Sequence, residues 1–211
     1  MKIECVKESL QKVVSKVDKI TGRNLTLPIL SCILFSIKNK QLNIKATNLD
    51  IGVEFSLPVK VIKEGEFAVP SALLSGYLSS VRSNNITLEY DGGVVVISSP
   101  HGKTTIKCLN HEDFPIIPKV PKDTIVSILS KDFISGVKSV WYAASPSSIK
   151  PELSSVYIYP SDGKVIFVAT DSFRLAEKQI HFKNGDFPPI LIPFKSIPEI
   201  IRCLEDVDGV V

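Results

Sequence analysis

The stretch ATDSFRLAEK, residues 169–178, repeats the frame of an earlier stretch, ATNLDIGVEF, residues 46–55. Both begin with Ala-Thr, and they start 123 positions apart. The same spacing separates four further pairs of identical or similar residues: Leu30-Ser31 and Leu153-Ser154, Leu10 and Phe133, Val14 and Val137, and Pro70 and Pro193. A repeat that keeps one spacing without a gap predicts two copies of a single structural unit.

Each copy alternates helical and strand-like patterns. Apolar residues recur at helical spacing over residues 8–20 and again over residues 69–81, which predicts two helices with one buried face each. Residues 29–61 form short apolar or alternating runs, typical of antiparallel strands. Residues 86–99 predict a hairpin about an Asp-Gly-Gly turn. With a further helix at 130–144 and another near the C-terminus, the fold class is α+β: duplicated domains of antiparallel sheets with helices packed on one side.

The duplication divides the chain into a first domain, residues 1–118, and a second domain, residues 124–211, joined by a Pro-rich linker at residues 119–123. By the 123-residue spacing, Val211 corresponds to Leu88. The second domain is therefore expected to be incomplete at its C-terminus, without counterparts of the later strands of the first.

Composition and charge exclude several classes of protein. Hydrophobic residues make up 44% of the 211, which is enough to build buried cores. The net charge of +3, from 25 basic and 22 acidic residues, is far from that of a histone-like nucleic-acid binder, so any contact with DNA must come from local patches. The N-terminus lacks a signal-length apolar segment, and no later run approaches a membrane span. These features favour a soluble protein of the reducing cytoplasm, with no membrane partner.

Metal, cofactor and catalytic sites are not predicted. The four cysteines lie far apart with no Cys-x-x-Cys pair, and the chain has three histidines, a pattern that argues against a zinc site. Within ATDSFRLAEK, Asp171 could serve as an acid or base, but no histidine, serine elbow or second carboxylate accompanies it in the nearby sequence. Asp171 is also suited to capping a turn. The stretch is therefore interpreted as a structural turn or a binding rim rather than an active site.

Basic residues line one side of the predicted helices. Lys12, Lys16 and Lys19 follow one another at i, i+4 and i+7, opposite the apolar side of the first helix, so they form a row of positive charge. Such a row can follow DNA phosphates, and it can equally be an ordinary solvated face. The second copy repeats the feature with Lys131, Lys138 and Tyr142 on helix 130–144, and with Lys195 and Arg202 on the last helix.

The chain resembles the bacterial sliding clamp, the beta subunit of the replicative DNA polymerase III, along its whole length. Six motifs carry the resemblance, in this order: LTLPILSCILF (25–35), ATNLDIGVEFSL (46–57), EDFP (112–115), KPELSSVYI (150–158), ATDSFRLAEK (169–178) and LIPFKSIPEI (191–200). The resemblance implies a DNA-clamp fold with three domains per chain that closes into a ring as a head-to-tail homodimer. The chain is then expected to hold the first domain and most of the second, and to form no ring by itself.

The resemblance also implies where DNA and a second subunit bind. In sliding clamps the helices line a central hole, and weak contacts to phosphates, independent of base sequence, suit a protein that slides along duplex DNA. The matching DNA-contacting residues are Lys12, Lys16, Lys19, Arg23, Lys131, Lys138, Lys195 and Arg202. The strand at 103–110 is expected at the subunit interface, with Thr104 and Ile106 as the matching residues.

A further implied site receives short peptides from DNA polymerase and clamp-loader subunits. Its hydrophobic pocket maps to Leu153, Thr170, Ser172, Phe173, Arg174 and Leu175. Sliding clamps often carry Gly and His where this chain has Ser172 and Phe173, which leaves the depth and peptide preference of the pocket open. The implied function is a non-catalytic replication processivity factor of the cytoplasm, associated with the nucleoid and without a cofactor. The alternative is a non-replicative interaction protein that keeps the duplicated scaffold without the ring.

Overall fold

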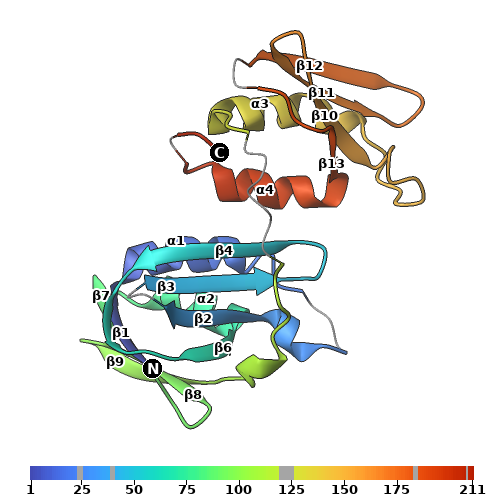
Figure 1. The fold of residues 1–211 in the computed structure, drawn as a ribbon. Helices are drawn as coiled ribbons and strands as arrows, with labels where there is room; N and C mark the ends of the chain where they lie inside the picture. The colour runs from blue at the N-terminus through green and yellow to red at the C-terminus, as the bar shows by residue number, and fades with distance from the viewer. Residues whose placement is uncertain (23–25, 39–40, 119–125, 183–184, 208) are drawn as a thin grey trace. The chain divides into compact units, whose positions relative to one another are not determined.

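The structure is a computed structural model that describes residues 1–211 except 23–25, 39–40, 119–125, 183–184 and 208. The chain folds into two compact units, Met1–Pro118 and Lys119–Val211, coloured from blue to green and from yellow to red in Figure 1. The expected linker at 119–123 lies outside the described residues. Each unit has its own sheets, helices and hydrophobic core.

The described residues of the first unit form two antiparallel sheets and two α-helices. Its elements are β1 (Lys2–Val6), α1 (Lys7–Val17), the 3-10 helix η1 (Pro28–Ser31), β2 (Cys32–Lys38), β3 (Gln41–Thr47), β4 (Gly52–Pro58), β5 (Lys60–Lys63), β6 (Glu66–Pro70), α2 (Ser71–Ser80), β7 (Asn85–Asp91), β8 (Val94–Ser99), β9 (Gly102–Lys107) and the 3-10 helix η2 (His111–Asp113). One sheet has the strand order β5-β1-β7-β8-β9, and the other has the order β4-β3-β2-β6.

The second unit repeats the four-stranded sheet and both helices. Its elements are α3 (Ser130–Val140), the 3-10 helix η3 (Trp141–Ala143), β10 (Ser155–Ser161), β11 (Lys164–Thr170), β12 (Leu175–His181), β13 (Ile190–Pro193), the 3-10 helix η4 (Phe194–Ser196) and α4 (Ile197–Leu204). The strand order β12-β11-β10-β13 is that of β4-β3-β2-β6, with each strand replaced by the one 123 residues later. The predicted α+β class with duplicated antiparallel sheets is confirmed.

Helix α1 forms because its apolar residues share one face: Leu10, Val13, Val14 and Val17 are all buried. The helix ends at Val17, three residues before its predicted end. The N–H of Ile20 donates to the Val17 carbonyl at 3.0 Å, a 3-10-type bond that tightens the chain into a turn. Ile20 is nevertheless buried, so the apolar pattern predicted its burial correctly and its helical conformation wrongly.

Two strand predictions are corrected at prolines. Pro28 opens the 3-10 helix η1, a position that suits its fixed φ, so the strand expected from residue 29 begins at Cys32. Within the strand-like runs predicted over 29–61, the stretch 53–61 divides at Pro58 because a proline cannot donate to a sheet ladder. Before this residue β4 pairs with β3, and after it β5 pairs with β1 in the other sheet.

The predicted hairpin is confirmed. Strands β7 and β8 pair up to Asp91 and Val94, and the two glycines between them have φ values of +55° and +86°. Two consecutive residues with positive φ are what a two-residue type I′ turn requires. The two glycines of Asp-Gly-Gly therefore specify this tight turn, because glycine adopts positive φ without steric cost.

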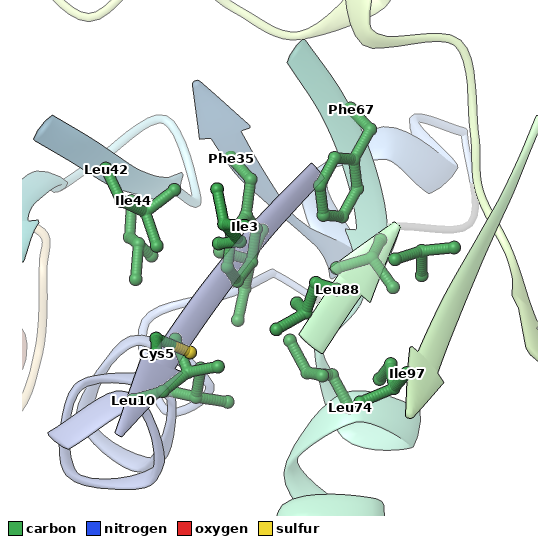
Figure 2. Close-up of a cluster of buried hydrophobic side chains, with 14 of the residues drawn as sticks. Ile3, Cys5, Leu10, Phe35, Leu42, Ile44, Phe67, Leu74, Leu88 and Ile97 are labelled. Atoms are coloured by element: carbon green, nitrogen blue, oxygen red, sulfur yellow. The ribbon is translucent and has the colours of Figure 1, made fainter. Parts of the chain in front are cut away.

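Strands β7 to β9 close the core of the first unit (Figure 2). Leu88 of β7 and Ile97 of β8 point into the same space as Phe67 of β6 and Leu74 of α2, and each of the four is at most 1% exposed. The Phe67 ring also stacks on Phe35, with ring centroids 5.0 Å apart. Residues from both sheets and both helices thus share one core.

The two units fill equivalent core positions with different volumes. In the second unit Gly136 of α3 lies against the ring of Phe167, and a Cβ at this glycine would meet a ring carbon at 2.5 Å. The equivalent residues of the first unit, Val13 and Ile44, are both buried. Relative to the first unit, the helix residue is smaller (Gly136 for Val13) and the strand residue is larger (Phe167 for Ile44). The two changes in side-chain volume therefore partly offset each other.

The repeat gains two residues near the C-terminal end. The N–H of Val211 donates to the Ile128 carbonyl at 2.8 Å, and the N–H of Ile128 donates to the Val211 carbonyl at 3.0 Å. This pairing matches that of Ile86 with Cys5 in the first unit. Val211 therefore corresponds to Ile86, whereas the constant spacing assigned it to Leu88. The two additional residues lie in the region of η4. In the second unit this 3-10 helix separates β13 from α4, whereas in the first unit α2 follows β6 directly.

Candidate protein-binding rim and charged helix faces

The turn between β11 and β12 is fixed by side-chain hydrogen bonds. The Thr170 hydroxyl donates to the Arg174 carbonyl at 2.7 Å and accepts from the Ser172 N–H at 3.1 Å. Asp171 Oδ1 accepts from the N–H groups of Phe173 and Arg174, both at 3.0 Å. Ser172 has a φ of +78°, an uncommon conformation for a residue other than glycine. The turn is therefore held in a single, well-defined shape.

The first unit contains the same turn between β3 and β4. The Thr47 hydroxyl donates to the Ile51 carbonyl at 2.8 Å and accepts from the Leu49 N–H at 3.0 Å. Asn48 Oδ1 accepts from the N–H groups of Asp50 and Ile51 at 3.0 and 2.9 Å. Leu49 has a φ of +77°. Since every bond recurs 123 residues later, the Thr and Asx positions serve the fold, and the side chains of Phe173 and Arg174 are not required for it.

Arg174 joins the second turn to Tyr142 of η3. Its Nε lies 3.0 Å from Asp171 Oδ2, and its guanidinium carbon lies 5.8 Å from the centroid of the Tyr142 ring, within the range of a cation–π interaction. The N–H of Phe173 contributes most to lowering the pKa of Asp171, and Arg174 adds to it through its N–H and its charge. The carboxylate is thus stabilised in its ionised form, which does not suit a general base near neutral pH.

Several apolar side chains in and near this turn are exposed to solvent. Phe173 is 98% exposed, Leu175 is 68% exposed and Tyr142 is 57% exposed. Leu153 is half-buried, and its carbonyl accepts from the Ser145 N–H at 2.8 Å, next to η3. We call these four residues, together with Thr170–Arg174, the rim. Direct contacts join Thr170, Asp171, Arg174 and Tyr142, whereas Leu153 lies in the neighbouring loop.

Sequence patterns missed the place of Tyr142 in the rim. Tyr142 was assigned to the polar side of a helix over 130–144, but α3 ends at Val140 and a 3-10 turn follows. The changed pitch brings the Tyr142 ring beneath Arg174. The ring of the neighbouring Trp141 stacks on that of Phe194, with centroids 5.4 Å apart, and packs against the core of the second unit. A residue just beyond a helix end follows no helical phase, so periodicity could not find Tyr142.

Carboxylates accompany several of the basic residues on the helix faces. Lys12 Nζ lies 3.3 Å from Glu8 Oε1, and Lys138 Nζ lies 3.0 Å from Glu205 Oε1. Arg202 forms an ion pair with Glu199. Of the other candidates, Lys19, Lys131 and Lys195 are exposed and Lys16 is half-buried, while Arg23 lies outside the described residues. The positive charge of these faces is therefore partly neutralised.

Strand β9 is the last strand of its sheet. The order β5-β1-β7-β8-β9 gives it one described neighbour along Gly102–Lys107. Thr104 is half-buried, and Ile106 is 5% exposed with its side chain in the core. The Ile106 side chain therefore packs within the first unit, and the place of Thr104 and Ile106 at a subunit interface stays a prediction. An edge strand can still offer its backbone N–H and C=O groups.

The described residues contain no group of three or more His, Cys, Asp or Glu side chains placed to hold a metal ion. None of the helices in the described part of the chain is both long and apolar enough to cross a membrane.

Comparison with known proteins gives consistent matches in both units. The family described as "DNA polymerase III beta subunit, N-terminal domain" matches residues 1–118, and the family described as "DNA polymerase III beta subunit, central domain" matches residues 127–211. The beta sliding clamp of Treponema pallidum is 27% identical over 208 residues, which cover 97% of this chain and 56% of the relative. That of a Staphylococcus epidermidis strain is 23% identical over 200 residues, 90% of this chain and 53% of the relative. The chain spans about half the length of these curated relatives.

Solved structures agree on the fold. The DNA polymerase III subunit beta of Pseudomonas aeruginosa superposes with a TM-score of 0.93 at 23% identity, over 100% of this chain and 58% of that one. The sliding clamp of Bacillus subtilis superposes with a TM-score of 0.92 at 21% identity, over 100% and 58%. The two family matches together cover most of the sequence, and the match to the N-terminal domain precedes the match to the central domain. The chain therefore belongs to the DNA polymerase III beta subunit family, the family of the beta sliding clamps.

Proposed function

We propose that the chain acts in DNA replication as part of a sliding clamp, a ring that encircles duplex DNA and tethers the polymerase to it. The observation that best supports the proposal is the match of the two units, in order, to the N-terminal and central domains of the beta subunit. Closure of the ring as a head-to-tail homodimer is part of the proposal. The clamp holds DNA by enclosing it and carries out no chemistry of its own.

The charged helix faces suit weak contact with DNA. Exposed side chains such as Lys19 and Lys195 can approach phosphates, while the carboxylates beside Lys12, Lys138 and Arg202 reduce the positive potential. Phosphate contacts carry no information about base sequence. A face with moderate charge therefore holds duplex DNA close without stopping the movement that a sliding clamp requires.

The rim is the part of the proposal that concerns protein partners, namely DNA polymerase and clamp-loader subunits. Its turn is already ordered by four hydrogen bonds, so little conformational entropy is lost when a peptide binds. Burial of one leucine or phenylalanine of the peptide against Leu153 and Leu175 contributes roughly 1.5–3 kcal/mol. The exposed ring of Phe173 adds apolar surface that a bound peptide can cover.

Peptide titration tests the rim. A fluorescent peptide with a leucine and a phenylalanine near one end should bind the wild-type chain weakly, and Leu153→Ala or Arg174→Ala should weaken it about tenfold, equivalent to about 1.4 kcal/mol. The control is Ile51→Ala, because Ile51 occupies the position of Arg174 in the first unit. Equal affinity for all four proteins would sink the proposed binding role. A large loss of melting temperature in the rim variants would assign these residues to structure instead.

A further inference from the structure

Two neighbouring recesses lie in the first unit, where the end of α2 meets the turn between β8 and β9. One has a volume of about 490 Å³ and is lined in part by Arg82, His101 and Lys103. The other has a volume of about 600 Å³ and is lined in part by Arg82 and His101. Among the described residues that line them, none is an aspartate or a glutamate. We call the two recesses together the basic recess.

Two separate segments of the chain bring these basic side chains together. Helix α2 ends two residues before Arg82. The ladder between β8 and β9 pairs Ser99 with Gly102, which leaves His101 in a two-residue turn, and Lys103 follows directly in β9. The side chains of Arg82, His101 and Lys103 are all exposed. A loop after a helix and a tight hairpin turn thus present basic groups to one recess.

The positive charge of the basic recess is not neutralised by neighbouring carboxylates. Elsewhere in the first unit, Lys45 and Lys60 lie 3.3 and 2.9 Å from carboxylate oxygens. None of the ion pairs between described residues includes Arg82, His101 or Lys103. Arg82 offsets the partial negative charge at the C-terminal end of α2, and Lys103 adds positive charge beyond it. The recess therefore attracts anions.

The hydroxyl groups of the recess are already bonded to the backbone. Those of Ser80, Ser83 and Ser99 donate to backbone carbonyls at 2.9, 2.6 and 3.2 Å. A ligand is therefore recognised by its charge rather than by a pattern of hydroxyl contacts. The basic side chains are distributed over both recesses, so a chain of linked phosphates matches them better than a single phosphate ion.

We propose that the basic recess binds the triphosphate chain of a small anionic ligand. The planar guanidinium of Arg82 can bond two phosphate oxygens at once, and Lys103 contributes a point charge. His101 has a ring N–H donor in either protonation state. The ligand is tripolyphosphate or a nucleoside triphosphate, since both carry the same chain. The site shares no residue with the rim or with the basic residues of the helix faces, so it does not depend on the proposed function.

Isothermal titration calorimetry of the 211-residue protein in metal-free buffer tests the site. Tripolyphosphate should bind saturably and about tenfold or more tightly than inorganic phosphate. ATP should bind at least as tightly as tripolyphosphate if the ligand is a nucleotide and more weakly if it is polyphosphate, while adenosine should not bind. Binding of tripolyphosphate should weaken between about 50 and about 200 mM salt, because exposed charges are screened.

Variants at exposed positions assign the binding to the recess. Arg82→Gln and Lys103→Gln should each weaken tripolyphosphate binding about threefold, as expected for exposed ion pairs, and the double variant should weaken it about tenfold. The matched control is Lys107→Gln. Lys107 is exposed on the same strand but lines neither recess, so its replacement should leave the affinity within about twofold. Absence of saturable binding, or an equal loss in all three single variants, overturns the proposal.

Discussion

Asp171 holds the second turn with a charged oxygen where the first turn uses the neutral Asn48. Because the amide makes the same two bonds to backbone N–H groups, the turn does not depend on a charge at this position. The charge matters for stability and its pH dependence instead. The N–H of Phe173 and the interactions with Arg174 hold the pKa of Asp171 below its usual value of 3.8.

We therefore expect Asp171→Asn to preserve the shape of the turn and to remove the titrating carboxyl at this position. A carboxyl whose pKa is lower in the folded state stabilises the fold above its unfolded-state pKa, and this contribution disappears as the pH falls through the folded-state pKa. At neutral pH the variant should have a lower melting temperature than the wild type. This difference in melting temperature should shrink as the pH falls below about 3.8. Calorimetric melting at several pH values measures it. A difference that is independent of pH would point to altered hydrogen-bond geometry.

Two glycines should respond to alanine in opposite directions. At Gly136 an added Cβ meets the Phe167 ring at 2.5 Å, while at Gly76 in α2 no atom lies within 4 Å. Gly136→Ala should destabilise the chain by about 1–3 kcal/mol because the core is overpacked. Gly76→Ala should stabilise it by about 0.4–1 kcal/mol because an exposed helix gains from alanine. Urea unfolding of both variants gives the comparison, and equal effects would contradict the packing argument.

At the scale of elements, the ion pairs on the helices set the strength of DNA contact. We expect Glu8→Gln to release Lys12 and tighten binding of duplex DNA by the chain at low salt. One additional phosphate contact should steepen the slope of log K against log salt by about 0.9. Anisotropy titrations between 50 and 200 mM salt measure it, with Glu112→Gln in η2 as the control. An unchanged slope would show that Lys12 does not face DNA.

Sequence patterns predicted the elements well where one face is buried and the turn residues are specific. The alternation in β3 and the two glycines after Asp91 identified a strand and a hairpin correctly. The patterns failed at element ends, since the burial of Ile20 continues beyond α1. The rim was predicted from the repeated frame and the family resemblance, but Tyr142 depends on a local change of helical pitch that no periodicity encodes.

At the scale of the molecule, the two units differ in how completely their cores are enclosed. Phe67 in the first unit is fully buried, whereas its counterpart Ile190 is 44% exposed. Regions with less buried apolar surface open at a lower free energy. We expect calorimetry to show two transitions, with the second unit melting first. Hydrogen exchange should assign the earlier opening to β10–β13, and faster opening of β1–β3 would contradict the expectation.

The contact of Gly136 with Phe167 also bears on the evolution of a gene that carries two related halves. Recombination between the halves would place Val13 of α1 against Phe167 of β11, or Gly136 of α3 against Ile44 of β3. The first product is overfilled and the second contains a void, and both lose stability. The complementary volumes thus disfavour exchange, because each half keeps its full stability when its helix and its sheet are inherited together.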